Sequence, residues 1–182
     1  TKEELVKGHI HHHFDTQMTT PKSTVILVAS ADMKNTLQNT VVSSAVNYIL
    51  DLIYTETIRE EEGGTYGVSS MGTISELPKN QYILQIAFDT DPEKAHKLIE
   101  LAHAGLTSLA ENGPSADYLA KAKENFLKNI PENHISNSYW KGQLGDYYRY
   151  GKDFDTEYEK VVKALTAEQV QGFVKEVLSQ EN

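Results

Sequence analysis

The histidines near the start of the chain are the first side chains whose spacing could do chemistry. His9, His11 and His13 alternate along the sequence, so in an extended strand they would lie on one face. Three imidazoles on one face can bind zinc. A solvated strand or the remnant of a purification tag explains a polar, histidine-rich beginning better. We therefore expect no native metal site at these histidines.

A second group of possible metal ligands lies in a predicted helix. His96, Glu100 and His103 are four and then three residues apart, so they share one face of that helix. This face lies roughly 100° to 160° from the apolar stripe around Ala102, by the helical period. We expect the three side chains to be solvated. The zinc motifs H-E-x-x-H and H-x-x-E-H do not occur in the sequence.

Other catalytic motifs are also missing from the sequence. The chain has no cysteine, which excludes thiol catalysis, disulfides and thiolate–zinc sites. No G-x-S-x-G nucleophile elbow occurs, and the glycine-rich residues 63–67 lack the lysine and the preceding strand of a P-loop. The sequence therefore contains no complete catalytic apparatus, and we assign no metal ligand.

Arg59 and Tyr66 form a different kind of candidate site. Arg59 follows Leu52 by seven residues, so in an α-helix it projects within about 20° of the same direction. Gly63 and Gly64 end the helix, and Tyr66 begins the next strand, so the two side chains could converge at one end of a sheet. The spacing alone favours a structural role. Arg59 would then complement the helix dipole and pair with Glu56 or Glu62, and Tyr66 would lie at the core edge with the parity of Val68.

The elements that must position this segment begin with a strand and a helix. Residues 23–30 (STVILVAS) form a short apolar run that is typical of a buried strand. An amphipathic helix is predicted from Asn35 or Thr36 to the glycine pair at 63–64. Alternating residues predict strands over 66–74 and 81–89, and the turn at 77–80 predicts a hairpin.

The rest of the chain is predicted to be helical. Pro92 starts a helix that ends at residues 112–114, and Ser115 starts another that breaks near Pro131. The aromatic-rich residues 137–150, a short helix over 154–165 and a last helix opened by a capping box at 166–169 follow. The resulting β-α-β-β-α-α order predicts an α+β, two-layer domain with helices on one face of a mostly antiparallel sheet.

The domain boundaries and the composition limit the class of protein. We expect residues 1–182 to form a single domain, with an N-terminal extension over 1–20 and C-terminal helices from about 136 to 182. The formal net charge of −9 disfavours nucleic acid and anionic membranes as partners, and no apolar stretch is long enough to span a bilayer. The first residues are not a signal peptide, so we expect the chain to be a piece of a longer protein.

Residues 59–68 (REEEGGTYGV) resemble the R-x6-Y segment of the pitrilysin/insulinase family of zinc metallopeptidases. The neighbouring sequences MTTPKSTV at 18–25, FDTDPE at 88–93, NGP at 112–114 and NSYW at 137–140 resemble the last domain of insulinase-like zinc proteases of Bacteroides-group bacteria. The similarity extends from about residue 14 to 180. It implies the same two-layer fold, as in the metallohydrolase domains of the pitrilysin and mitochondrial-processing-peptidase group.

The resemblance also implies a division of labour. Such proteases enclose a peptide substrate between two halves, and an N-terminal half carries the H-x-x-E-H zinc site. The matching residues imply that Arg59 binds substrate and that Tyr66 binds substrate and stabilises the oxyanion, as the catalytic residue of this chain. The cofactor zinc is then held by another domain of the parent or by a partner subunit. A location in the bacterial periplasm or cell envelope is also implied by the resemblance.

Two other functions remain open from the sequence. The chain could be a noncatalytic homologue that acts as a structural or interaction domain, and an H-x-x-E-H motif upstream in the parent would argue against this. It could also be a self-contained metal-binding protein that uses the N-terminal histidines. Because the zinc motif is absent, the sequence leaves open whether this chain alone is an enzyme, whereas the parent is expected to be a zinc metalloendopeptidase.

Overall fold

A computed structural model of the chain describes residues 8–17, 19–61 and 65–180; the side chains of Arg59, Glu60, Glu61 and Tyr66 lie outside the described part. The elements are β1 (Ser23–Asp32), α1 (Leu37–Tyr54), the π-helix η1 (Thr55–Glu61), β2 (Thr65–Ser75), β3 (Gln81–Thr90), the 3-10 turn η2 (Pro92–Lys94), α2 (Ala95–Asn112), α3 (Ala116–Ile135), α4 (Asn137–Tyr150), α5 (Tyr158–Ala164) and α6 (Ala167–Ser179). This order confirms the predicted β-α-β-β-α-α arrangement.

The three strands form one antiparallel sheet in the order β1-β3-β2. β3 lies in the centre, and its pairing with β1 runs without interruption from Ser23↔Thr90 to Asp32↔Gln81. Alternate side chains of β3 are buried, because they point toward the helices, whereas Ile83 on the other face is 40% exposed. The alternation read from the sequence is therefore confirmed.

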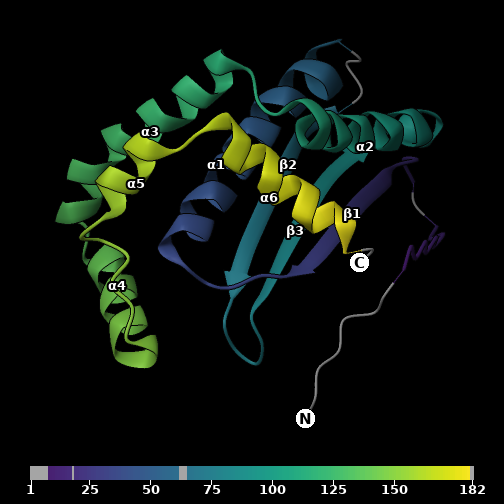
Figure 1. The fold of residues 1–182 in the computed structure, drawn as a ribbon. Coiled ribbons are helices and arrows are strands. Elements are labelled where there is room, and N and C mark those ends of the chain that lie inside the picture. Colours follow the sequence, from purple (N-terminus) through teal and green to yellow (C-terminus); the bar gives the residue numbers. More distant parts are fainter. Residues whose placement is uncertain (1–7, 18, 62–64, 181–182) are drawn as a thin grey trace.

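The helices cover one face of this sheet (Figure 1). α1 packs on β2, whereas α6 and α2 lie over β1, and α3 and α5 pack against α1. The buried apolar side chains of these elements form one core, to which the largest contributions are Tyr54, Tyr82, Ile49, Leu50, Ile58, Leu84, Ile86, Leu98 and Leu109. The predicted α+β, two-layer class is therefore correct.

Local sequence signals fix several helix ends. The Thr36 side chain accepts a hydrogen bond from the backbone of Asn39 and caps α1. Thr166 and Gln169 form the predicted capping box at the start of α6. Gly151 ends α4 in the left-handed conformation that glycine adopts without a steric penalty.

Two predicted helix boundaries were wrong. α3 continues through Pro131 to Ile135 rather than breaking there. Pro131 is exposed, so water can satisfy the carbonyl that loses its partner. The helix expected from residue 154 begins only at Tyr158, because the Asp153 carboxylate accepts hydrogen bonds from the backbone N–H groups of Asp155 and Thr156 and holds them in a turn.

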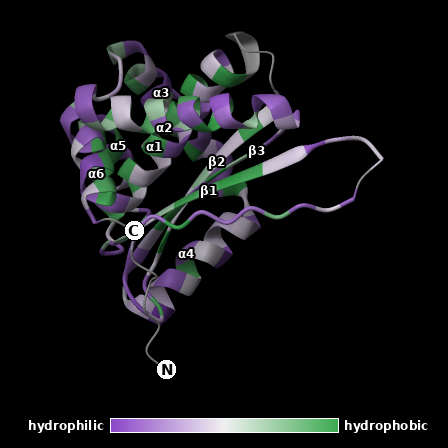
Figure 2. Cartoon of the chain, turned by 90° about the vertical axis from the view of Figure 1, so that its right-hand side faces the viewer, coloured by the Kyte–Doolittle hydropathy of each residue, from purple (hydrophilic) through white to green (hydrophobic). Residues whose placement is uncertain are grey.

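Two parts of the chain stand apart from the core. α4 has no buried residue and projects away from the helix layer in both Figure 1 and Figure 2. Residues 8–17 precede the sheet as an exposed segment without helix or strand. Within the described residues, no helix is both long enough and apolar enough to cross a membrane.

Candidate functional site

The structure places the backbone of Arg59 and of Tyr66 at the same end of the sheet. Arg59 belongs to η1 and Tyr66 to the first residues of β2, and these two segments pack against each other. This end is the one where Thr65 and Ser23 both pair with Thr90. Gly63, Gly64 and the two side chains lie outside the described part, so their convergence stays a prediction.

The helix that carries Arg59 changes its winding before it reaches this residue. α1 gives way at Thr55 to a π-helix, which takes more residues per turn than an α-helix. The expectation that Arg59 projects in the same direction as Leu52 rested on the α-helical period, which does not hold beyond Thr55. The Arg59 side chain lies outside the described part, so its direction stays a prediction. The residue that the π-helix turns into the core is Ile58, which is fully buried.

Neighbouring helices hold η1 in place on two sides. The fully buried Tyr54 donates a hydrogen bond from its hydroxyl to the carbonyl of Ala102 in α2, over 2.8 Å. Gly105 permits this approach, since a Cβ there would lie 2.7 Å from the Tyr54 ring. On the other side Tyr118 of α3 donates to the Glu56 carboxylate, and this bond raises the pKa of Tyr118 to about 12. The backbone next to Arg59 is therefore fixed against α2 and α3.

Tyr66 lies in a β-bulge. Thr65 pairs with Thr90 and Val68 with Phe88, so β2 has one residue more than β3 over this stretch. The Thr65 hydroxyl donates to the Gly67 carbonyl over 3.0 Å and accepts from the Gly67 N–H over 3.2 Å. The bulge interrupts the regular alternation of β2 at this point. The Tyr66 side chain lies outside the described part, so its position at the core edge stays a prediction.

Side chains of α1 close the outer edge of β2 farther along the strand. Asp51 accepts hydrogen bonds from the backbone N–H and the hydroxyl of Ser70, over 2.9 and 2.7 Å. Asn47 donates to the Gly72 carbonyl over 3.2 Å. Sequence reasoning missed this pair, although two polar residues four apart in the mostly apolar second half of the helix were the available signal. The edge of β2 is thereby closed to another strand at these positions.

Two cavities lie at the opposite end of the sheet. One, of about 430 Å³, is bounded by α1, the β2–β3 hairpin and the end of α4, and its walls include Thr40, Ser43, Ser44, Ser75, Glu76 and Tyr150. The other, of about 530 Å³, lies beside Asp32 and Lys79. Neither is lined by η1 or by residues 65–68. The candidate segment therefore does not border either of these two cavities.

The histidines are not gathered into a metal site within the described part of the chain. His13 contacts Asp15 at 3.0 Å in the exposed N-terminal segment. His96 lies 3.4 Å from Glu100, and both side chains are mostly exposed, as the helical period predicted. Among the described residues no three histidine, cysteine, aspartate or glutamate side chains are placed to hold a metal ion. Zinc therefore does not fit the donors that this part of the chain offers.

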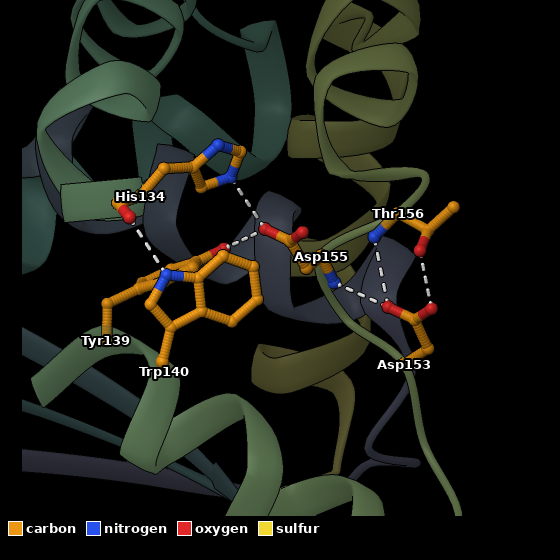
Figure 3. A network of polar contacts seen from close by, with 6 residues as sticks. All are labelled: His134, Tyr139, Trp140, Asp153, Asp155 and Thr156. Atoms are coloured by element: carbon orange, nitrogen blue, oxygen red, sulfur yellow. Dashed lines mark hydrogen bonds and ion pairs between the residues drawn. The ribbon is translucent and has the colours of Figure 1, made fainter. Parts of the chain in front are cut away.

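A polar network at the corner between α3, α4 and α5 was not predicted from the sequence (Figure 3). The Asp155 carboxylate accepts a hydrogen bond from the Tyr139 hydroxyl over 2.5 Å and lies 2.9 Å from Nε2 of His134. Trp140 donates from its indole to the His134 carbonyl over 2.9 Å. No serine, threonine or lysine faces His134 in this network, so we interpret it as the brace that sets the direction of α4.

Several solved structures with this arrangement are described as proteases or peptidase domains. The periplasmic protease PqqL from Escherichia coli superposes with a TM-score of 0.78 at 24% identity over 90% of this chain. The ferredoxin protease FusC, solved with Arabidopsis ferredoxin, gives 0.72 at 17% identity over 86%. A peptidase M16 inactive domain from Pseudomonas fluorescens gives 0.68 at 25% identity over 89%. The chain therefore shares the two-layer fold of these solved proteins.

The sequence narrows this class to one family. The family model described as the peptidase M16 inactive domain matches residues 4–126. The chain belongs to the M16 peptidase family and corresponds to its inactive domain. It spans 18% of the length of PqqL and of FusC and 40% of the P. fluorescens protein. A comparison with curated protein sequences finds no match.

Proposed function

We propose that this chain is the substrate-contacting and closure domain of a zinc-dependent endopeptidase that cleaves peptides in an enclosed chamber. Arg59 and Tyr66 contact the peptide opposite a zinc ion held by another domain of the parent or by a partner subunit. The observation that carries the proposal is the match to the M16 inactive domain, which spans both residues. Residues 1–182 then act as one domain of a longer chain.

The backbone geometry supports these roles. Arg59 lies in a π-helix that is fixed against α2 and α3, and Tyr66 lies in a bulge that the Thr65 hydroxyl holds. Both irregularities recur near functional sites, because they redirect side chains that a regular helix or strand would turn elsewhere. Because the backbone that carries the two hydrogen-bond donors is fixed, the site needs little reorganisation when a substrate binds.

The chemistry of the two side chains suits an acyl-transfer site. A phenol donates one hydrogen bond to a developing oxyanion, and an arginine offers several donors to peptide carbonyls together with a permanent positive charge. One such oxyanion donor is typically worth about 3 kcal/mol in the transition state. Because the donors lie on a domain that carries no metal motif, catalysis depends on closure of the two halves around the peptide.

The experiment that tests this proposal measures peptide cleavage by the parent protein. Tyr66→Phe is expected to lower kcat about 100-fold with little change in KM, since only an oxyanion donor is lost. Arg59→Ala is expected to lower kcat/KM, because substrate positioning is lost as well. Matched controls are Tyr147→Phe and Arg149→Ala on α4, where Tyr147 is 56% exposed; both are expected to leave activity unchanged.

Two outcomes would contradict the proposal. Activity that stays within about twofold while the melting temperature falls would show that Arg59 and Tyr66 are structural. A parent without any H-x-x-E-H motif and without a partner that supplies one would favour the alternative of a noncatalytic interaction domain.

The cell envelope is the compartment that we propose for the parent. The support is the fold shared with PqqL, which is a periplasmic protease. Fractionation of cells that produce the parent protein tests this, since recovery in the cytoplasmic fraction alone would contradict it.

A further inference from the structure

β1 has a free edge. Among the described residues it pairs with β3 on one side only, and it runs for ten residues with its outer side uncovered. Ile26 and Val28 of this strand are 58% and 60% exposed on the face away from the helices. Figure 2 looks onto this edge and shows β1 as a largely hydrophobic strand. A long apolar edge strand of this kind is a template for another strand.

The hydrogen bonds of Asp32 show which residues face outward. Gln180 of the segment after α6 accepts from the Asp32 N–H over 2.7 Å and donates to its carbonyl over 3.2 Å. In an antiparallel ladder both backbone groups of a residue point to the same side, and alternate residues point to opposite sides. The outward backbone groups before Asp32 therefore belong to Thr24, Ile26, Val28 and Ser30. Gln180 caps the edge at Asp32 and leaves these four residues open.

We propose that a second copy of this chain adds to this edge, so that two β1 strands pair antiparallel about a twofold axis at Leu27. In this register Ile26 faces Val28 of the second copy and Thr24 faces Ser30. Apolar side chains meet apolar ones, and hydroxyls meet hydroxyls. Each open backbone group finds a partner, and the two three-stranded sheets become one continuous sheet.

Charge complementarity selects this register over its neighbours. The backbone pairing ends at Thr24 and Ser30, because Gln180 occupies the backbone groups of Asp32. Beyond this end only the side chains of Lys22 of one copy and Asp32 of the other come together. Within its own copy Lys22 pairs with Asp89 and Asp32 with Lys79. Each end of the interface thus gathers two cations and two carboxylates. If the second strand is shifted by two residues in one direction, the hydroxyl of Thr24 faces the apolar Val28. If it is shifted by two residues in the other direction, Thr24 has to pair with Asp32, whose backbone groups Gln180 already occupies.

The N-terminal segment is the competing occupant within the same chain. Residues 8–17 are exposed and make no hydrogen bond to β1 within the described part. In Figure 2 the segment runs in front of the sheet alongside β1, so a second copy has to displace it from this edge. The new pairing buries little area for a protein interface, so the dimer is expected to dissociate in the micromolar range or above.

Sedimentation velocity on the 182-residue chain, from about 1 µM to 1 mM, tests the proposal. A concentration-dependent dimer is expected. Ile26→Lys should raise its dissociation constant at least about tenfold, because the change occurs twice in a symmetric interface. Met71→Lys is the matched control: Met71 is 61% exposed on the same face but belongs to β2, so the dimer should persist.

Charge reversal and cross-linking report the register directly. Lys22→Asp and Asp32→Lys should each weaken self-association, and mixing the two variants should restore a heterodimer in which every facing pair is opposite in charge. Leu27→Cys places two thiols beside the twofold axis of a chain that has no other cysteine, so mild oxidation should give a disulfide-linked dimer. Met71→Cys should give none.

Three results would overturn the proposal. The chain could stay monomeric over the whole concentration range. A dimer could survive Ile26→Lys and be lost with Met71→Lys, which would place the interface on β2. A variant lacking residues 1–17 could dimerise while the full chain does not, which would assign the edge of β1 to the N-terminal segment.

Discussion

Arg59 and Tyr66 belong to different elements, and each follows a backbone irregularity rather than a regular period. The π-helix that contains Arg59 and the bulge around Tyr66 are both held by side chains with no direct role in the proposed chemistry. Tyr54, Tyr118 and Thr65 are in this sense positioning residues. A substitution at one of them is expected to act on the candidate site through the backbone.

Thr65 offers the simplest test at the residue scale. Thr65→Val keeps the side-chain shape but removes the hydroxyl that bonds to both backbone groups of Gly67. We expect it to lower the free energy of unfolding by about 0.5–1 kcal/mol, measured by urea denaturation. Thr65→Ser keeps the hydroxyl, so its free energy of unfolding should lie closer to that of the unchanged chain. Equal stability of Thr65→Val and the unchanged chain would show that the hydroxyl does not hold the bulge.

At the scale of elements, the contact between α1 and α2 decides where η1 lies. Gly105 is the point of closest approach, and an added Cβ would lie 2.7 Å from Tyr54 and 3.3 Å from Ile53. The two edges of the sheet also differ at this scale. Asn47 and Asp51 close β2, whereas β1 stays open from Thr24 to Ser30.

Gly105→Ala tests the contact between the two helices. Replacing a helical glycine with alanine gains about 1 kcal/mol of helix propensity, but overpacking against Tyr54 costs about 1–3 kcal/mol. We expect a net destabilisation in thermal and urea unfolding. Gly172→Ala in α6 is the matched control, because no atom lies within 4 Å of the added Cβ, and it should stabilise the chain by about 0.5–1 kcal/mol. If both variants were stabilised alike, the packing at Tyr54 would not be tight.

The whole molecule has one covered and one uncovered sheet face. The helices bury one face, while Ile26, Val28, Met71 and Ile83 remain exposed on the other. The chain also spans 18% of PqqL and of FusC, so the proposed activity depends on parts of the parent that close over this domain. An apolar open face suits a surface that other polypeptide covers.

Alkaline pH tests the fold as a whole, because the pKa values of five tyrosines are raised. Burial raises those of Tyr54, Tyr82, Tyr139 and Tyr158, with that of Tyr82 at about 12, and the bond to Glu56 raises that of Tyr118 to about 12. A raised pKa means that the fold favours the neutral phenol, so its contribution to stability is complete below about pH 10 and is lost as the pH rises toward 12.

The melting temperature is therefore expected to fall steeply between pH 10 and 12, together with a rise in phenolate absorbance. In Tyr118→Phe the fall should be shallower, since one of the shifted groups is gone. If the difference in melting temperature between Tyr118→Phe and the unchanged chain stayed constant up to pH 12, this would contradict the role assigned to the bond between Tyr118 and Glu56.

The sequence by itself determined the elements whose signals are local. The alternation at 81–89, the cap at Thr36 and the capping box at Thr166 each depend on residues close together in the chain, and all were confirmed. The segment 59–68 also pointed to the family that the match over residues 4–126 then established. Only the tertiary structure decided the π-helix, the bulge, the brace at Asp155 and the continuation of α3 past Pro131. These features depend on partners far along the chain, such as Ala102 for Tyr54, Thr90 for Thr65 and Asp155 for His134, or on exposure to water, neither of which a local period encodes.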